Sequence, residues 1–545
     1  MKVKAGFSGV ALSGIVLLTG FLFITYSNSA NEHIGEWSEP ELLFVDPDTS
    51  QAGNLEAVVY ESTIYIVKRH LRQIDDQYLD LSQIYLLRKQ PGGEPKIQQL
   101  SSGTYPSEQP VIFRDHSNGL HFIWGNRRQD PDFEEWGIPR PQITGFSTDI
   151  VYSQLDSEGL CQPTHLFEGH LRRPSGIGDI GFPLQLTGDG FNRLHTVFRA
   201  DTTFKTTNSD GEEIIGFSPR VTYMRRNSTG EWSVPRFLEF GGDPDIAISS
   251  KDNLVIAWLG ADPNQSGIND VLVTVSNDGG DTWSEPELIM PSGNQAGRML
   301  ELQATSNGII HLIWGRQTTS LPVPNEFWHS YSEDGGRSWS KPNRFFEPVQ
   351  TSGTSLSFFG DFDLVADKYG RLHWAGVEAR NQHGDSLSFI QYNTWNPLKK
   401  SWNQAATVNI AKDPQEVDLA MDKNSNELYL FWKDRIEKTL YYSTASPGEP
   451  SPAVLTESGP LKLHANYPNP FNPSTTIPFT LDKPAEVILR VYDVTGRQVL
   501  QQNLGMKSAG LHDYEINLDG MASGTYVYEV EVTLDGRYRE QGRVK

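Results

Sequence analysis

The stretch S-N-D-G-G-D-T-W at 276–283 decides the fold, because it recurs almost unchanged as S-E-D-G-G-R-S-W at 332–339. Each copy follows a β-rich run and leads through S-E-P or S-K-P into another apolar run, which is the layout of a hairpin turn. The aspartate can accept hydrogen bonds from turn N–H groups, and the second glycine can adopt the positive φ that closes the turn. The pattern therefore predicts a recurring turn whose tryptophan packs into the gap between strands.

The shared pattern S-x-D-x-G-x-x-W resembles the Asp-box of sialidase-like β-propellers. In that family the box stabilises a turn that lies away from the active site, so the resemblance implies a structural role here, with a functional role as the alternative. The residues concerned are Ser276, Asp278, Gly280, Trp283, Ser332, Asp334, Gly336 and Trp339.

A second motif repeats at intervals of 56 to 74 residues and indicates the architecture. It is a short strand of the form apolar, His or similar, two mostly apolar residues, aromatic, as in L-H-F-I-W at 120–124. Its second position falls at Tyr65, His121, His195, Val255, His311, His373 and Tyr429. Seven such units of about four strands, without a helical pattern, predict an all-β, seven-bladed β-propeller over residues 33–446. A six-bladed ring is the alternative.

The two ends of this region are expected to meet. The last unit runs into proline-rich chain after Ser443 without a fourth strand, while the segment from Trp37 to Phe44 matches the W-S-E-P-E-L segment after the first Asp-box. The N-terminal strand is therefore predicted to complete the last blade and leave no sheet edge unpaired. The repeated histidines are interpreted as side chains packed between blades, because a ring spreads equivalent positions apart. Metal ligation by these histidines is the alternative.

The N-terminus has the features of a secretory signal peptide over residues 1–30. Lys2 and Lys4 precede an apolar run at 10–24, and small residues follow it. An uncleaved membrane anchor is the alternative, since the run is nearly long enough to span a bilayer. The single cysteine, Cys161, cannot form an internal disulfide and is interpreted as a small buried hydrophobe.

The C-terminus forms a separate unit. Residues 447–460 are a proline-rich linker by composition, and residues 461–545 alternate like a small Ig-like β-sandwich. The strings N-Y-P-N-P-F-N-P-S-T-T-I at 466–477, Y-D-V-T-G-R at 492–497 and S-G-T-Y at 523–526 resemble the sorting domain of type IX secretion cargo. The resemblance implies a Gram-negative bacterium, the type IX secretion machinery as a partner of residues 461–545, and secretion or attachment at the outer-membrane surface.

The composition excludes some partners and leaves others open. A formal net charge of −22 argues against nucleic acid and anionic membranes, so the membrane matters only through export or surface attachment. We expect a monomer without a cofactor or metal. The one place where Ca²⁺ comes into question is the long acidic loop at 126–145, which could also act as a lid.

The candidate site lies in the loops after the second strand of each unit, which are expected to open opposite the Asp-boxes. An acidic protein gathers arginines there, and arginine suits bidentate capture of carboxylates. Arg114, Arg199 and Arg316 are the predicted ligand-binding residues, and Asp115, Asp201 and Glu378 are candidate acid or base groups. An acidic sugar is the predicted ligand, and charged loop residues that are merely solvated are the alternative.

The resemblance to sialidases does not extend to their catalytic motifs. The early F-R-I-P string is absent; F-R-D at 113–115 and F-R-A-D at 198–201 depart from it after the arginine, and sialidases have six blades rather than seven. Three hypotheses follow: a propeller that binds extracellular glycan or glycoprotein, a glycoside hydrolase or lyase, and a non-catalytic surface scaffold or adhesin.

Overall fold

The computed structural model describes residues 36–448, 461–463 and 473–544 with internal gaps. The gaps lie at 46–54, 71–81, 103–105, 130–145, 157–158, 168–176, 208–210, 212, 250–251, 262–268, 292–296, 318–323, 347–357, 383–384, 409, 435, 482, 494–496, 522–523, 525 and 535–537. The predicted signal peptide at 1–30 and most of the predicted linker at 447–460 lie outside the described residues.

The described residues before 449 form seven antiparallel sheets, numbered here as blades 1 to 7. Strands 1 of the blades are β2 (Leu55–Tyr60), β6 (Ser107–Arg114), β11 (Ile177–Gly188), β15 (Gly242–Ile248), β19 (Gly297–Ala304), β23 (Phe358–Ala366) and β28 (Pro414–Asp422). Strands 2, which carry the repeated motif, are β3 (Thr63–His70), β7 (Leu120–Gln129), β12 (Leu194–Thr207), β16 (Leu254–Ala261), β20 (Ile310–Arg316), β24 (Leu372–Gln382) and β29 (Glu427–Asp434).

The outer half of each blade completes the sheet. Strands 3 are β4 (Gln83–Lys89), β8 (Phe146–Asp156), β13 (Glu213–Arg226), β17 (Asn269–Ser276), β21 (Glu326–Ser332), β25 (Asp385–Asn396) and β30 (Thr439–Ala445). The outermost strands are β5 (Lys96–Gln99), β10 (Thr164–Phe167), β14 (Arg236–Phe240), β18 (Glu287–Met290), β22 (Asn343–Phe346), β26 (Ser401–Trp402) with β27 (Ala406–Val408), and β1 (Glu41–Val45). The short strand β9 (Gly159–Leu160) pairs with β8.

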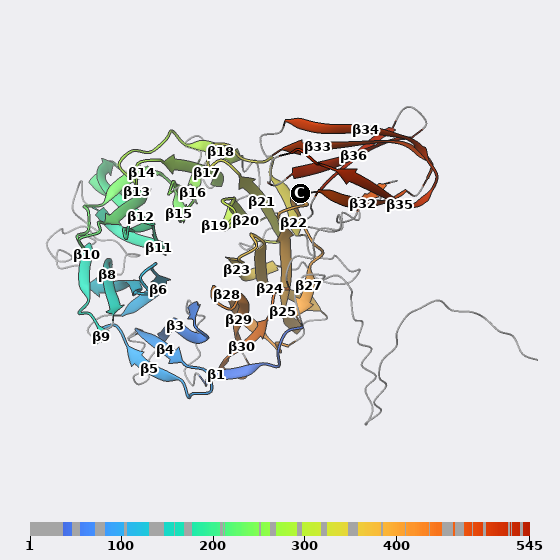
Figure 1. The fold of residues 1–545 in the computed structure, drawn as a ribbon. Coiled ribbons are helices and arrows are strands. Elements are labelled where there is room, and N and C mark those ends of the chain that lie inside the picture. Colours follow the sequence, from blue (N-terminus) through green and yellow to red (C-terminus); the bar gives the residue numbers. More distant parts are fainter. Residues whose placement is uncertain are drawn as a thin grey trace, which may run out of the picture.

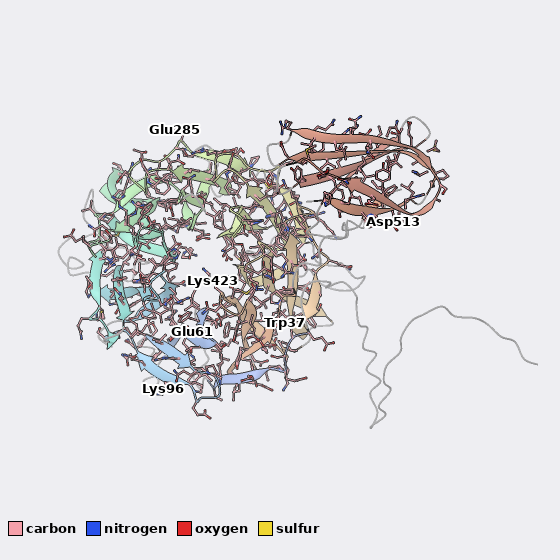
Figure 2. The ribbon with its side chains drawn as sticks, viewed as in Figure 1. Trp37, Glu61, Lys96, Glu285, Lys423 and Asp513 are labelled. Atoms are coloured by element: carbon pink, nitrogen blue, oxygen red, sulfur yellow. The ribbon has the colours of Figure 1, made fainter. Side chains whose placement is uncertain are left out.

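The blades stand in a ring around a common axis, as Figure 1 shows. Figure 2 gives their orientation: Lys96, in an outermost strand, and Glu285, just before another, lie on the perimeter, whereas Glu61 and Lys423, in turns after strands 1, lie toward the centre. Strand 1 is thus innermost and the fourth strand outermost. The chain is an all-β propeller.

The first strand of the ring pairs with the last blade. β1 runs antiparallel to β30, with Glu41 opposite Tyr442 and Val45 opposite Thr439. Ser38 N continues the ladder by donating to Thr444 O at 2.8 Å. The predicted N-terminal closing strand is therefore observed in the predicted place.

The core lies in the seams between blades. Seven clusters of buried apolar side chains each combine residues of two adjacent blades, so every seam of the ring holds one. The aromatic that ends the repeated motif is central to this packing and is essentially inaccessible in five blades, as Trp124, Phe198, Trp258, Trp314 and Trp432. In blade 6 the motif lacks this aromatic, and Trp374, which directly follows His373, is buried instead. The sequence motif therefore marks the side chains that join neighbouring blades.

The C-terminal residues form a two-sheet sandwich. One sheet has the order β31 (Leu461–Leu463), β32 (Ser474–Leu481), β35 (Gly510–Asn517), and the other β34 (Gln498–Lys507), β33 (Ala485–Asp493), β36 (Tyr526–Leu534), β37 (Tyr538–Val544). Its core is a separate cluster that includes Ile477, Val487 and Val530. The predicted sandwich therefore has a hydrophobic core of its own.

Candidate functional site

The ring has two ends that differ in their connections. At the turn end, tight turns join strand 1 to strand 2, and the two Asp-boxes join strand 3 to the outermost strand of blades 4 and 5. In blade 2, for example, Asp115 N donates to Gly119 O at 3.0 Å to close the turn. The loop end carries the connections from strand 2 to strand 3, and long parts of these fall outside the described residues. The expected binding surface is the loop end.

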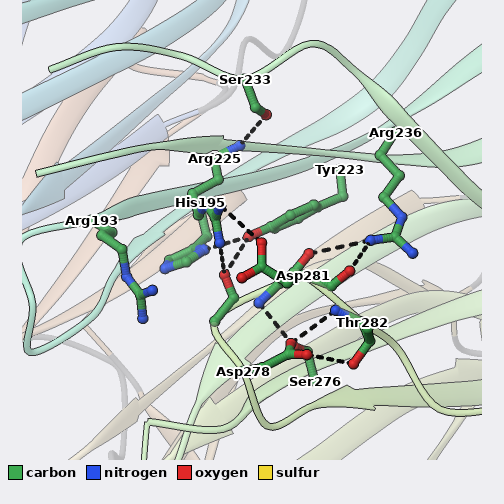
Figure 3. A network of polar contacts seen from close by, with 12 residues as sticks. Arg193, His195, Tyr223, Arg225, Ser233, Arg236, Ser276, Asp278, Asp281 and Thr282 are labelled. Carbon is green, nitrogen blue, oxygen red and sulfur yellow. Dashed lines mark hydrogen bonds and ion pairs between the residues drawn. The ribbon is translucent and has the colours of Figure 1, made fainter.

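The Asp-box of blade 4 is a fully hydrogen-bonded turn (Figure 3). The Asp278 carboxylate accepts bonds from Thr282 N at 2.9 Å, from the Thr282 hydroxyl at 2.5 Å and from the Ser276 hydroxyl at 2.8 Å. These bonds hold the pKa of Asp278 below its usual value. Gly279 and Gly280 both have positive φ, at 74° and 93°, so the turn uses two left-handed residues where one was expected.

The same box also binds the preceding blade. Arg225 of blade 3 donates to Gly279 O at 2.7 Å and lies 3.0 Å from the Asp281 carboxylate. The Trp283 ring meets the Tyr223 ring edge to face at 5.1 Å between centroids. The box thus stabilises both its own turn and the seam between blades 3 and 4.

The Asp-box of blade 5 repeats this arrangement. Asp334 accepts from Ser338 N at 2.9 Å and from the Ser332 hydroxyl at 2.8 Å, and Trp339 Nε1 donates to Gly336 O at 3.1 Å. Trp339 packs on the core cluster that blades 4 and 5 share. Both boxes are therefore occupied by contacts within the ring.

Three of the repeated histidines belong to buried triads. In blade 3, His195 Nδ1 lies 2.7 Å from the Tyr223 hydroxyl and His195 Nε2 lies 3.2 Å from the Asp189 carboxylate. An equivalent triad in blade 2 is Asp115, His121 and Tyr152. In blade 6, His373 Nδ1 lies 2.6 Å from the Tyr392 hydroxyl, and His373 Nε2 lies near the Asp367 carboxylate, at 3.5 Å, without a hydrogen bond. Burial lowers the pKa of His195 although the carboxylate opposes this shift. Each triad links the inner turn of a blade to its third strand, so these histidines serve the blade itself.

The structure corrects the placement of two predicted site residues. Arg114 ends strand β6 and Asp115 begins the turn that follows, so both lie at the turn end. The Arg114 guanidinium stacks on the Tyr60 ring at 3.5 Å, and Asp115 accepts bonds from turn N–H groups and lies 2.9 Å from His121 Nε2. The prediction that they join the other arginines around one ligand is wrong, because an eight-residue strand separates them from the loop end.

The remaining candidates do lie toward the loop end. Arg199 forms a bidentate pair with Asp201, with Nε and Nη2 at 3.0 and 3.2 Å from the carboxylate oxygens, and its side chain is 39% exposed. Arg316 lies over the Trp328 ring at 5.5 Å. Glu378 is fully buried and accepts a bond from Gln391 Nε2 at 2.8 Å. The side chain of the paired Arg199 is therefore accessible to solvent, whereas Glu378 is not.

Other arginines near the loop end are also matched by carboxylates. Arg69 lies 3.8 Å from Glu108 across the seam of blades 1 and 2, and Arg344 lies 3.0 Å from Glu326 in blade 5. Three arginines near the loop end, Arg69, Arg199 and Arg344, are therefore each paired with a carboxylate. Such pairs present both donors and acceptors to a ligand.

The inner strands are distorted at this end. Gln109, Asp243 and Met299 have φ of 52°, 48° and 48°, and each lies where the register of its inner strand shifts. A side chain in this left-handed region is strained, and such strain gathers at functional sites. Each bulge interrupts the regular pairing of the inner strand of its blade near the loop end.

A set of carboxyl groups on the inner strands escaped prediction. Five inner strands each carry an acidic residue at the same register position. Its partner on strand 2 is the residue that comes two places after the second position of the repeated motif. The five residues are Glu56, Asp245, Glu301, Asp363 and Asp418. The signal was present in the sequence, since these residues precede their repeated positions by nine to eleven places (56 to 65, 245 to 255, 301 to 311, 363 to 373, 418 to 429). We call them the carboxyl belt.

Within the described ranges, no group of three or more His, Cys, Asp or Glu side chains could hold a metal ion. The loop at 126–145, which was considered for Ca²⁺, lies largely outside the described ranges. No helix in the described part of the chain could span a membrane.

Cys161 is exposed, so its interpretation as a buried hydrophobe is wrong. It follows the two-residue strand β9, which leaves it outside the packed face of blade 2.

Residues 465–536 match the family model described as a secretion system C-terminal sorting domain. The chain therefore carries a tail that indicates type IX export. No curated protein matches the chain. A solved structure from Dyadobacter fermentans is similar at 10% identity and a TM-score of 0.45 over 76% of this chain and 100% of that one. The α-L-arabinanase of Penicillium chrysogenum is similar at 11% identity and 0.39 over 76% and 99%, and the NanB sialidase of Streptococcus pneumoniae at 12% and 0.34 over 75% and 70%.

Proposed function

We propose that this exported protein works at the cell surface or in the medium as a glycan-binding β-propeller, with the loop end of the ring as its binding surface. Residues 461–545 would deliver it through the type IX machinery, in keeping with the family match inside that range. The observation that carries the binding surface is the Arg199 and Asp201 pair, whose arginine side chain is 39% exposed, beside strained inner strands.

The chemistry of this pair suits a sugar. Sugar hydroxyls both donate and accept hydrogen bonds, and the guanidinium and carboxylate offer both partners side by side. An acidic sugar would engage the guanidinium bidentately, in competition with Asp201, and Arg316 would supply a second cation. Residues at the mouth of a propeller channel can act together because the ring brings loops from separate blades to one end.

Glycoside hydrolysis is a second candidate, favoured by one observation. Burial raises the pKa of Asp245 to about 7, although hydrogen bonds from Leu302 N and Ile246 N oppose this shift. A carboxyl group that holds its proton near neutral pH has the property that a general acid needs. A panel of chromogenic glycosides tests this candidate directly.

A glycan array with the mature protein tests the binding proposal. We expect an Arg199→Ala, Arg316→Ala double variant to stay folded and to lose at least tenfold in affinity for acidic glycans, a loss of about 1.4 kcal/mol. We also expect the wild-type affinity to fall as salt rises. Arg225→Ala is the matched control, because it removes an arginine and carboxylate pair at the turn end of the same blade.

Three outcomes would count against this assignment. Equal binding of neutral and acidic glycans would remove the role of the arginines, and unchanged binding by the double variant would place the site elsewhere. Absence of any glycan binding or glycosidase activity would favour a scaffold or adhesin.

A further inference from the structure

The carboxyl belt joins blades to one another through the backbone. Asp245 of blade 4 accepts a bond from Leu302 N of blade 5 at 2.6 Å, and Glu301 of blade 5 accepts one from Leu364 N of blade 6 at 3.2 Å. The series continues around the ring, since Asp363 binds Leu419 N at 2.6 Å and Asp418 binds Ala57 N at 2.7 Å. Each acceptor in this series therefore holds the inner strand of the next blade, from blade 4 round to blade 1.

Members of the belt also lie close to each other. The carboxyl group of Asp363 lies within hydrogen-bonding reach of Glu301 on one side and of Asp418 on the other. Two carboxylates cannot form such a bond unless one of them carries a proton. Hydrogen bonds along the row Glu301, Asp363 and Asp418 would therefore require shared protons in the folded ring.

The groups facing the belt add further negative charge. Asp361 and Asp245 act on Glu56, and Glu416 acts on Asp361, which itself accepts a bond from Val417 N at 3.1 Å. Burial, followed by the neighbouring carboxylates, raises the pKa of Glu56, Glu301 and Asp418 well above the usual values. Burial also raises the pKa of Asp363, although its hydrogen bonds oppose the shift.

We propose that the carboxyl belt is a proton-dependent clasp between blades 4, 5, 6, 7 and 1, tight while its members share protons and loosened when they ionise. In the folded chain these carboxyl groups bind protons that the unfolded chain releases above about pH 4. The folded state then holds more protons than the unfolded state, so the clasp contributes most to the free energy of unfolding below that pH. This contribution is lost as the pH rises through the raised pKa values of the folded state, which is about 7 for Asp245.

The proton count on unfolding is the first test. We expect denaturant unfolding of the whole wild-type protein at pH 7.5, in weakly buffered solution, to release roughly one proton or more per molecule. Unfolded histidines are largely neutral at this pH, so their proton uptake does not mask the release. A net uptake, or no exchange of protons, would overturn the proposal.

A substitution locates the effect. Asp363→Asn keeps an acceptor for Leu419 N and supplies a permanent donor to Glu301 and Asp418, so it should flatten the fall in Tm between pH 6 and pH 9. Asp281→Asn is the control, because that carboxylate is 65% exposed at the turn end and should leave the slope unchanged. If the Tm of Asp363→Asn fell between pH 6 and pH 9 as steeply as that of the wild type, the proposed clasp would be contradicted. If that variant does not fold, the proton count still decides.

Discussion

Single carboxylates make several of the polar contacts that hold this ring together, and the position of each one decides which parts it joins. Asp278 and Asp334 close outer turns, Asp189 anchors a histidine, and Asp245 holds the next blade. The same side chain is strongly ionised in the first setting and holds its proton near neutral pH in the last. Hydrogen bonds to N–H groups lower a carboxyl pKa, whereas burial beside other carboxylates raises it.

Replacing the Asp-box carboxylates should affect stability but not binding. Asp278→Ala and Asp334→Ala are each expected to reduce the unfolding free energy by about 1 kcal/mol, the low end for lost charged hydrogen bonds, because water can reach the freed N–H groups. Chemical denaturation measures the loss, and the glycan array measures binding. Asp513→Ala, an exposed position of the sandwich, should change neither. Binding lost at unchanged stability would show that the boxes are functional.

Two residue-level predictions failed for reasons that sequence could not reveal. F-R at 113–114 looks like F-R at 198–199, but Arg114 ends an inner strand and Arg199 lies within a second strand, so they point to opposite ends of the ring. Cys161 was expected to be buried because of its residue type, yet it follows a two-residue strand and is exposed. The position of each residue relative to the strands of its blade, rather than the local composition, determines where Arg114 lies and whether Cys161 is buried.

At the scale of strands, the sequence predicted the repeat well and the irregularities poorly. The aromatic that ends the motif in five of the seven second strands recurs at a regular spacing, so it indicated which residues pack between blades. The bulges at Gln109, Asp243 and Met299 were not predicted, because none of these residues favours a positive φ as glycine does. The acidic residue of the inner strand was overlooked because it interrupts an apolar pattern instead of forming one.

The strand β1 offers an element-scale prediction. Removing residues 31–45 takes away the partner of β30 and uncovers apolar side chains that include Leu43, which is 3% exposed. We expect the whole propeller to lose stability, with Tm falling by about 5 °C or more, because a ring opened at one blade loses a seam. Removing the outer strand β5 at 96–99 is a useful comparison, since its four side chains are exposed. A Tm unchanged by the N-terminal truncation would show that β1 is dispensable.

At the scale of the molecule, the tail and the ring have separate hydrophobic cores. Deleting residues 461–545 should therefore leave a folded propeller that stays in the cell envelope, since the export tail is gone. Cell fractionation with a protease-protection assay would locate it, and circular dichroism of the purified fragment would show whether it folds. Normal surface delivery of the shortened chain would contradict the role of the tail, and an unfolded fragment would contradict the independence of the ring.

The pairing of β1 with β30 also fixes when this protein can finish folding. The side chains of Ser38 and Ser443 meet across 405 residues of sequence, so the last blade cannot close until nearly the entire ring has left the ribosome. The entropy cost of joining two segments grows only slowly with the length of chain between them. The main effect of this pairing is therefore to delay the completion of the ring rather than to destabilise it.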